Sequence, residues 1–324
     1  MPSLLLTEPL SCPNGLQVGK NVLFETVGEN EFRAANVHSG QQLVCKVFPV
    51  SRYLRSVAVY HHLPVHPNLS QLTETVVGET MAYVFFELVS YGNMHTYVQT
   101  SRSLDEDEAS RLFHQMVSVV AHCHNNDVVL RDLKLRKFLF KNPQRTMLTL
   151  SNLEDTHMVE KGDDSVYGKH GCPVYASPEG LQAEGKYSGK AADVWSLGVV
   201  LYTILVGRYP FSDSNSNILY NKIRRCKFSL PDTLSPKARC LIQSILRLDP
   251  TERLTAEEIL DHPWFSSPNS QKVWRTVLEA ELRPSRFHNE TEAVRVRESA
   301  ADKEPCERTR RLELQLITEQ ELFG

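Results

Sequence analysis

Short apolar runs with a strand-like pattern dominate the first part of the chain. They fill residues 22–48 and 76–88. Between them, residues 52–62 show a short helical pattern that ends before Pro64. This order predicts a small β-sheet with one helix inserted between its strands.

Apolar positions recur at helical spacing in the rest of the chain, from about Met94 onward. Residues 105–125 give a clear example. Its apolar positions are Leu112, Met116, Val119 and Val120. Further helices are predicted at 195–206 and 236–248. The apolar run 194–207 is too short to span a bilayer, which indicates a buried helix. A strand-rich part followed by a helical part indicates the α+β class.

Composition narrows the possible functions. The chain has 324 residues, of which 41% are hydrophobic, enough to bury a core of two lobes. The formal net charge of -3 gives no general attraction to nucleic acid or to an anionic membrane, so we expect neither as a partner. The cysteines are scattered without a Cys-x-x-Cys pair, which favours a reducing compartment and argues against zinc. We interpret His122 and His124 as part of the helix over 105–125, not as metal ligands, and expect no metal site.

The two ends of the chain differ from its middle. Residues 1–15 have a leucine run but no basic start, so a signal peptide is not expected. We interpret residues 1–20 as a flexible segment. Residues 21–265 form the predicted folded domain. Residues 266–324 interleave Glu and Arg and contain few aromatic residues, which is typical of a flexible, charged, partner-binding tail. Short helices are expected in it at 271–282 and 307–316.

Residues 129–137 read V-L-R-D-L-K-L-R-K and match the kinase catalytic-loop pattern H-R-D-L-x-x-x-N. Asp132 stands at the position of the catalytic base, and Lys134 is also retained. Leu130 replaces the His, and Lys137 replaces the Asn that holds a second magnesium ion. The ammonium group of Lys137 cannot bind a magnesium ion, because both are cations. The loop is therefore kept, while its ability to hold the second magnesium ion is lost.

The magnesium-binding D-F-G triplet is missing from residues 138–179. Asn152, Leu153 and Glu154 take its place. Asn152 is a neutral amide and lacks the charge that fixes a hard dication, while Glu154 replaces a Gly that permits positive φ. The alternative is a carboxylate supplied from a shifted register by Glu154 or Asp155.

The phosphate-binding elements before this point are also degraded. The run L-V-C-K-V-F resembles the V-A-I-K strand and makes Lys46 the phosphate-pairing lysine. The preceding residues 26–34 contain one Gly, and Glu29 and Glu31 repel phosphate there. Residues 47–73 contain no acidic residue, so the next helix cannot supply the usual Glu partner of Lys46. The alternative interpretation of Lys46 is a solvated or core-edge lysine.

The structural motifs of a kinase are intact. Residues 170–179 read H-G-C-P-V-Y-A-S-P-E and resemble the end of an activation segment, with Cys172 in place of its Thr. Asp193 begins D-V-W-S-L-G, the motif of a buried central helix. Arg253 lies in D-P-T-E-R-L-T and matches the Arg that pairs with the Glu of A-P-E, here Glu179.

These motifs together resemble the Tribbles pseudokinases over about residues 22–265, and the Asn-Leu-Glu triplet favours the third vertebrate Tribbles branch. The resemblance implies a bilobal protein-kinase-like α+β fold with a small β-rich N-lobe and a larger helical C-lobe. It implies a pseudokinase, in which Asp132, Lys134, Lys137, Asn152 and Glu154 are degenerate remnants. No cofactor is then required, and Lys46 is the candidate for weak ATP binding without magnesium.

The resemblance also implies partner-binding segments. In the family, an Ile-Leu-x-His-Pro-Trp-Phe segment is implicated in binding mitogen-activated protein kinase kinases. Here it is Ile259, Leu260, His262, Pro263, Trp264 and Phe265, with Asp261 at x. The alternative is core packing, since active kinases often end in His-Pro-Trp-Phe. The tail motif for a constitutive photomorphogenic-type E3 ubiquitin ligase is degenerate, and its nearest match is Glu319, Gln320, Leu322 and Phe323.

The leading hypothesis is a scaffold and negative regulator of signalling kinases and transcription factors in nucleus and cytoplasm. Its expected partners are mitogen-activated protein kinase kinases, Akt-type kinases and transcription factors. The E3 ubiquitin ligase is also expected from the family, although its binding motif in the tail is degenerate. One alternative is a weak, metal-independent ATP-binding serine/threonine kinase. Another is a peptide-binding module with an occluded nucleotide cleft.

Overall fold

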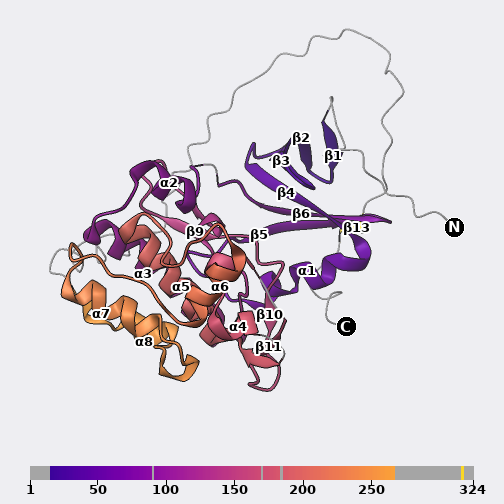
Figure 1. Ribbon diagram of the computed structural model, residues 1–324. Helices are drawn as coiled ribbons and strands as arrows, with labels where there is room; N and C mark the ends of the chain where they lie inside the picture. The colour runs from indigo at the N-terminus through magenta and orange to yellow at the C-terminus, as the bar shows by residue number, and fades with distance from the viewer. Residues whose placement is uncertain (1–14, 90, 169–170, 183–184, 267–314, 317–324) are drawn as a thin grey trace, which may run out of the picture.

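The structure, a computed structural model, describes residues 15–89, 91–168, 171–182, 185–266 and 315–316, which form a small β-sheet lobe and a larger helical lobe (Figure 1). This is the predicted bilobal, kinase-like α+β arrangement. The predicted flexible ends, 1–20 and 266–324, lie largely outside the described residues. The predicted start of the folded domain at residue 21 is too late, since Leu16–Val18 form a paired strand and Val18 is buried.

The N-lobe is built on an antiparallel sheet with the strand order β1-β2-β3-β4-β6-β5-β13. Its strands are β1 (Leu16–Val18), β2 (Asn21–Gly28), β3 (Glu31–Asn36), β4 (Gln42–Pro49), β5 (Leu72–Val77), β6 (Met81–Glu87) and β13 (Gln315–Leu316). Leu43, Cys45 and Val47 alternate along β4 as buried residues of one sheet face. Because successive side chains of a strand point to opposite faces, Lys46 projects from the other face.

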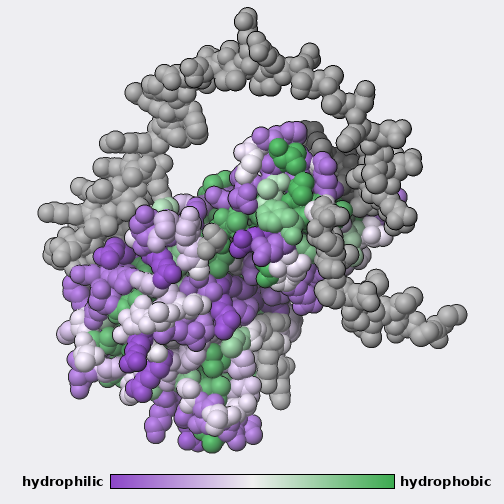
Figure 2. Space-filling model, turned by 90° about the horizontal axis from the view of Figure 1, so that it is seen from above, coloured by the Kyte–Doolittle hydropathy of each residue, from purple (hydrophilic) through white to green (hydrophobic). Residues whose placement is uncertain are grey.

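Helix α1 (Val50–His62) packs against the sheet through Tyr53 and Val57, which share a core cluster with Ala82, Val84 and Phe86. It begins at Val50, two residues before the predicted start, and has no acidic residue in its first turn. The apolar surface of Figure 2 gathers mainly on the smaller lobe, seen from above. Phe24 and Val27 of β2 are exposed apolar residues of that lobe.

The C-lobe is mainly helical. Its α-helices are α2 (Met94–Ser101), α3 (Glu106–Asn125), α4 (Pro178–Gln182), α5 (Gly189–Val206), α6 (Ser216–Arg224), α7 (Pro236–Ile245) and α8 (Ala256–Leu260). Its 3-10 turns are η1 (Leu135–Lys137), η2 (Pro173–Tyr175), η3 (Pro250–Glu252) and η4 (Pro263–Phe265). Its short strands are β7 (Val128–Val129), β8 (Phe138–Phe140), β9 (Leu148–Leu150), β10 (His157–Met158), β11 (Ser165–Tyr167) and β12 (Lys186–Ser188).

Helix α5 is the centre of the C-lobe. It starts at Gly189, six residues before the predicted 195, because the side chain of Ser188 caps it by accepting from the backbone N–H of Ala191. Among the described helices, α5 alone is long and apolar enough to pass as a membrane span, but 78% of it is buried. This burial agrees with the prediction of a core helix.

The strand β13 corrects one predicted helix. The expected helix at 307–316 is wrong at its last two residues, since Gln315 and Leu316 pair with Val77 and Val76 at the edge of the N-lobe sheet. An uncovered edge strand offers free backbone hydrogen-bonding groups, which favour an added strand over a helix. The rest of that predicted helix, and the one at 271–282, lie outside the described residues.

A buried ion pair joins distant parts of the C-lobe. The guanidinium of Arg253 donates to both carboxylate oxygens of Glu179, at 2.6 and 2.8 Å, and to the carbonyl of Ala191. Arg253 also lies over the ring of Trp195, 5.0 Å from its centroid. Its side chain is 1% exposed, so these contacts offset the cost of burying its charge.

A histidine pair fixes the loop after α1 to the C-lobe. Nδ1 of His66 accepts from the backbone N–H of Asn68, so its proton lies on Nε2 and is donated to Ser118 of α3, at 3.1 Å. The His122 ring lies 4.8 Å from that of His66, and Nε2 of His122 is 2.9 Å from the carbonyl of Pro64. Burial and the nearby His122 lower the pKa of His66 to about 4.

We expect Arg253→Met to lower the free energy of unfolding by about 3–5 kcal/mol, because it leaves the Glu179 carboxylate without its buried partner. Urea denaturation checks this. Arg239→Met is the matched control, since Arg239 pairs at the surface with the exposed Asp232 and should show little loss. Equal effects of the two substitutions would contradict the prediction.

We expect acid to destabilise the protein through His66. The pKa of His66 in the folded state, about 4, lies below the usual value of 6.5. Between these two pH values His66 is protonated in the unfolded chain but not in the folded one, so the unfolded chain binds more protons. The stabilisation is complete above pH 6.5 and is lost as the pH falls towards about 4. Urea midpoints measured across this window should fall less steeply for His66→Gln than for the unchanged chain, and parallel slopes would refute the assignment.

Candidate functional site

The catalytic-loop backbone is shaped by Asp193 of α5. One carboxylate oxygen of Asp193 accepts from the backbone N–H of Leu130 at 2.7 Å, and the other accepts from that of Arg131 at 2.8 Å. The same carboxylate contacts His124 at 3.0 Å. Arg131 has a positive φ of 61°, a conformation that such bonds stabilise. The D-V-W-S-L-G motif therefore positions the loop that carries Asp132.

Asp132 is held by lysines of its own loop. Its Oδ2 lies 2.6 Å from Nζ of Lys134 and 3.6 Å from Nζ of Lys137. Burial lowers the pKa of Lys137, although the nearby Asp132 acts in the opposite direction. Gly171 of the activation segment, at a φ of +74°, closes over Asp132, and a Cβ there would meet Oδ1 at 2.9 Å. Lys134 and Lys137 contact only Oδ2, while Oδ1 is buried and has no hydrogen-bond partner among the described residues.

Lys46 lies in a cluster of acceptors. Its Nζ donates to Oδ1 of Asn152 at 2.5 Å and to Oε1 of Glu154 at 2.6 Å, and lies 3.5 Å from Oε1 of Glu31. Glu31 is the direct cross-strand neighbour of Lys46 in the β3–β4 register. The side chain is 12% exposed, so the solvated interpretation of Lys46 does not fit its surroundings.

Tyr60 of α1 connects the helix to this cluster. Its hydroxyl donates to Oε1 of Glu154 at 3.3 Å and accepts from the backbone N–H of Leu153 at 2.9 Å. Burial, together with the Glu154 charge, raises the pKa of Tyr60 well above its usual value, so the phenol stays protonated. As predicted, α1 supplies no acidic partner for Lys46. The sequence did not reveal that Tyr60 and Glu154 would fill this place.

The backbone of the Asn-Leu-Glu triplet is not strained at Glu154. The positive φ of the triplet falls on Asn152, at 61°, and Glu154 is not among the described non-glycine residues with positive φ. Asn tolerates this conformation better than most residues. Leu153 is 1% exposed and anchors the triplet in the core. The loss of the D-F-G glycine therefore needs no compensating distortion.

The donor set does not suit magnesium. The Oδ1 atom of Asn152 already accepts from Lys46, and Glu154 is engaged by the same ammonium group. Lys137 places a buried ammonium near Asp132. Of the two shifted-register carboxylates, Glu154 would first have to leave Lys46, whereas Asp155 lines a cavity together with Asp132 and Lys134.

The predicted partner segment at the end of the C-lobe is packed inside at three positions, Ile259, Trp264 and Phe265. Nε1 of Trp264 donates to Glu106 at 3.0 Å, and Phe265 stacks on Phe113 at 6.2 Å. Ile259, Trp264 and Phe265 are buried, at 0%, 4% and 6% exposed. The remaining residues of the segment reach the surface. Leu260 and His262 are half-buried, and Asp261 and Pro263 are exposed. The tail residues Glu319, Gln320, Leu322 and Phe323 lie outside the described residues.

Comparison with known proteins places this geometry in a family. The protein kinase domain family matches residues 30–265. The chain is 59% identical to "Tribbles homolog 2" of Canis lupus familiaris over 251 residues, which cover 77% of this chain and 73% of that protein. It is 57% identical to "Tribbles homolog 1" of Homo sapiens over 239 residues, or 74% of this chain and 64% of that protein. The chain belongs to the Tribbles pseudokinase family.

The Tribbles relatives do not single out the third branch. "Tribbles homolog 3" of Mus musculus is 46% identical over 273 residues, covering 82% of this chain and 77% of that protein. The identities to homologs 1 and 2 are higher. The Asn-Leu-Glu triplet alone is therefore too short to decide the branch.

We expect Glu154→Gln to strengthen ATP binding. The substitution removes a negative charge from the place of the phosphates and loosens the hold on Lys46. The dissociation constant should fall by about three- to tenfold, the effect of removing one charge at about 4 Å in a partly solvated cleft. Thermal-shift titration with ATP measures it. Glu25→Gln, an exposed partner of Arg33, is the control, and an unchanged or weaker affinity of Glu154→Gln would contradict the prediction.

Proposed function

We propose that this chain is a catalytically impaired pseudokinase that acts as a scaffold and negative regulator of signalling kinases and transcription factors. The observation that carries this proposal is that the protein's own side chains occupy Lys46, the lysine that would pair with phosphates. Its ammonium group donates to Glu154 and Asn152. Phosphoryl transfer depends on positioning and charge neutralisation of phosphates, and these are the functions the cleft has lost.

No cofactor is required for this role. ATP without magnesium remains a candidate ligand, because Lys46 and Lys137 are cations within the cleft, and Lys137 sits where an ion would otherwise neutralise charge. Glu31 and Glu154 oppose ATP binding, since both carboxylates lie within 4 Å of Lys46 and would repel the phosphates. Weak binding is the expected balance of these terms.

The proposed partners are proteins. Mitogen-activated protein kinase kinases, Akt-type kinases and transcription factors are the classes that the family resemblance favours, in nucleus and cytoplasm. A link to a constitutive photomorphogenic-type E3 ubiquitin ligase is the less supported part, because the tail motif is degenerate at Glu319–Phe323. The near-neutral charge balance supports neither nucleic acid nor membrane as a partner.

The second candidate is a weak, metal-independent serine/threonine kinase. Retention of Lys46, Asp132 and Lys134 favours it. In its active form Glu154 would have to release Lys46 to the phosphates, and Lys134 would have to release Asp132.

We expect no magnesium-stimulated phosphorylation by the purified full-length chain. Transfer from labelled ATP to a generic protein substrate is measured with magnesium and with a chelator. Capture of the proposed kinase partners is measured in parallel, and Asp132→Asn and Lys46→Met should leave it unchanged. Magnesium-dependent transfer that Asp132→Asn abolishes would overturn the pseudokinase proposal, and loss of capture in both variants would overturn the scaffold proposal.

A further inference from the structure

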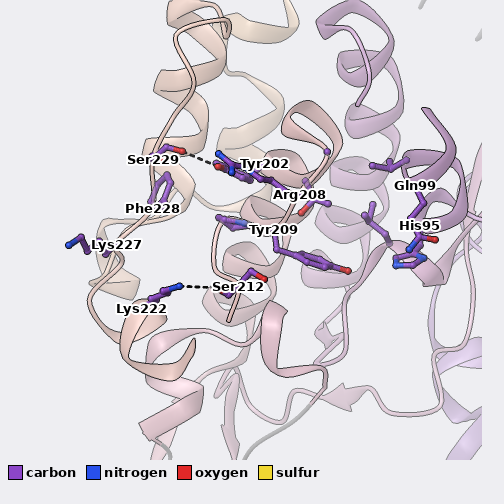
Figure 3. A pocket seen from close by; sticks show the side chains of 15 residues that line it. His95, Gln99, Tyr202, Arg208, Tyr209, Ser212, Lys222, Lys227, Phe228 and Ser229 are labelled. Atoms are coloured by element: carbon purple, nitrogen blue, oxygen red, sulfur yellow. Dashed lines mark hydrogen bonds between the residues drawn. The ribbon is translucent and has the colours of Figure 1, made fainter. Parts of the chain in front are cut away.

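Two hollows of the described C-lobe lie away from the catalytic cleft. One lies between α2, the end of α5 and α6, with Arg208 and Lys222 in its lining (Figure 3). The other lies at the opposite end of α5, where the end of α3, the start of α5 and α8 meet. Its volume is about 410 Å³, within the range of small-molecule sites. We call this second hollow the α3–α8 cavity, and its main lining residues are Ala121, Asn125, Lys190, Val194, Ala256 and Glu257.

Part of the lining of the α3–α8 cavity is apolar and closely packed. Ala121, Val194 and Ala256 are buried and belong to the core cluster that fills the C-lobe. Leu254 is half-buried and packs against the same cluster. Close packing holds such side chains in place, and their small size leaves room for a ring or a branched aliphatic group. Burial of an apolar body against them is favourable.

Two buried polar side chains of the lining, His124 and Arg253, already have partners. Nε2 of His124 contacts Asp193 at 3.0 Å, and the guanidinium of Arg253 donates to both carboxylate oxygens of Glu179. Neither side chain needs a ligand to be satisfied, so the shape of the cavity does not depend on one. A preformed site loses little conformational freedom when a ligand binds.

The charge at the rim of the cavity comes mainly from Lys190. Its Nζ lies 3.6 Å from Oδ1 of Asp127, whose side chain is 59% exposed. An exposed pair of this length contributes little, so the ammonium group can take a second partner. Glu257 is the acid among the described lining residues, and its Oε1 accepts from Asn125 at 2.5 Å. Lys190 is therefore the group best able to pair with a charge on a ligand.

A cation or a peptide suits the cavity less well than a small anion. A cation would meet Lys190, and the carboxylate that it needs, on Glu257, is already engaged by Asn125. A peptide would bring backbone N–H and C=O groups that must find partners, whereas the buried polar side chains of the lining, His124 and Arg253, are already satisfied. A compact apolar body with one anionic group avoids both costs.

We propose that the α3–α8 cavity binds a small organic anion with an aromatic or branched aliphatic body. The body packs against Ala121, Val194 and Ala256, and the anionic group pairs with Lys190. This inference goes beyond the proposed scaffold function, since it concerns a small molecule and not a protein partner.

The test uses the full-length chain and 8-anilinonaphthalene-1-sulfonate as the probe. The probe has an aromatic body and one negative charge, and its fluorescence rises in apolar surroundings. Titration should show saturable binding with a dissociation constant between about 10 µM and about 1 mM, as expected for a ligand of this size. Fluorescence that does not saturate up to about 1 mM would overturn the proposal.

Single charge changes locate the anionic group. Lys190→Gln should weaken probe binding by about three- to tenfold, because it removes the paired cation. The matched control is Lys186→Gln, since Lys186 also forms an exposed pair, 3.5 Å from Asp163, but does not line the cavity. Glu257→Gln should strengthen binding by about two- to threefold, because it removes a negative charge from the rim. Equal weakening by Lys190→Gln and Lys186→Gln, or weakening by Glu257→Gln, would overturn the assignment.

A bulky side chain at the rim provides an independent test of position. Asn125→Trp should cover the cavity and weaken probe binding by about tenfold or more. The matched control is Asn217→Trp, at an exposed residue of α6 outside the cavity, which should leave binding unchanged. Unchanged melting temperatures verify folding of the variants. Equal effects of the two Trp substitutions would overturn the proposal.

The hollow of Figure 3 is the competing location for the probe. If Arg208→Gln weakens probe binding while Lys190→Gln and Asn125→Trp do not, the probe occupies that hollow and the proposal falls. Probe binding is measured without phosphoryl transfer and without a partner protein, so this proposal and the proposed function fail separately.

Discussion

The ammonium group of Lys46 is the point on which the character of this protein depends. In a strand whose neighbours Cys45 and Val47 are buried, Lys46 must project into the cleft between the lobes. A buried ammonium needs partners. Asn152 and Glu154 provide them from the triplet that replaces D-F-G, and Glu31 adds a second carboxylate across the sheet. The group that would pair with phosphates is thus satisfied before any nucleotide approaches.

The same arrangement couples α1 to the cleft. Tyr60 contacts both the Glu154 carboxylate and the backbone of Leu153, so the helix, the triplet and Lys46 form one hydrogen-bonded unit. A change that releases Glu154 also removes a partner of Tyr60. The position of α1 and the availability of Lys46 are therefore linked through a phenol, although α1 has no acidic residue in its first turn.

Most of the fold could be predicted from the sequence because its signals are local. Apolar periodicity predicted α3 and the strands. The D-V-W-S-L-G motif predicted Asp193 in a buried helix, and the D-P-T-E-R-L-T motif predicted the pairing of Arg253 with Glu179. Element starts were less predictable, since α5 begins at a Ser188 cap that precedes its apolar pattern. The Lys46 partners were missed because Glu154 lies 108 residues away in the chain, and only folding brings it close. The edge strand β13 was missed for the same reason.

The parts of the domain that were kept and the parts that were lost follow different physical demands. Asp193 and the Arg253–Glu179 pair are buried in the C-lobe, where removing one partner leaves an unpaired charge in the interior. Asn152 and Lys137 replace residues whose roles in a kinase concern a metal ion, and each finds a partner within the protein: Asn152 accepts from Lys46, and Lys137 lies 3.6 Å from Asp132. The substitutions in the cleft therefore cost the fold little, because the cleft balances its own charges. This domain therefore keeps the packing of the kinase fold while Lys46 contacts Asn152 and Glu154 of its own chain.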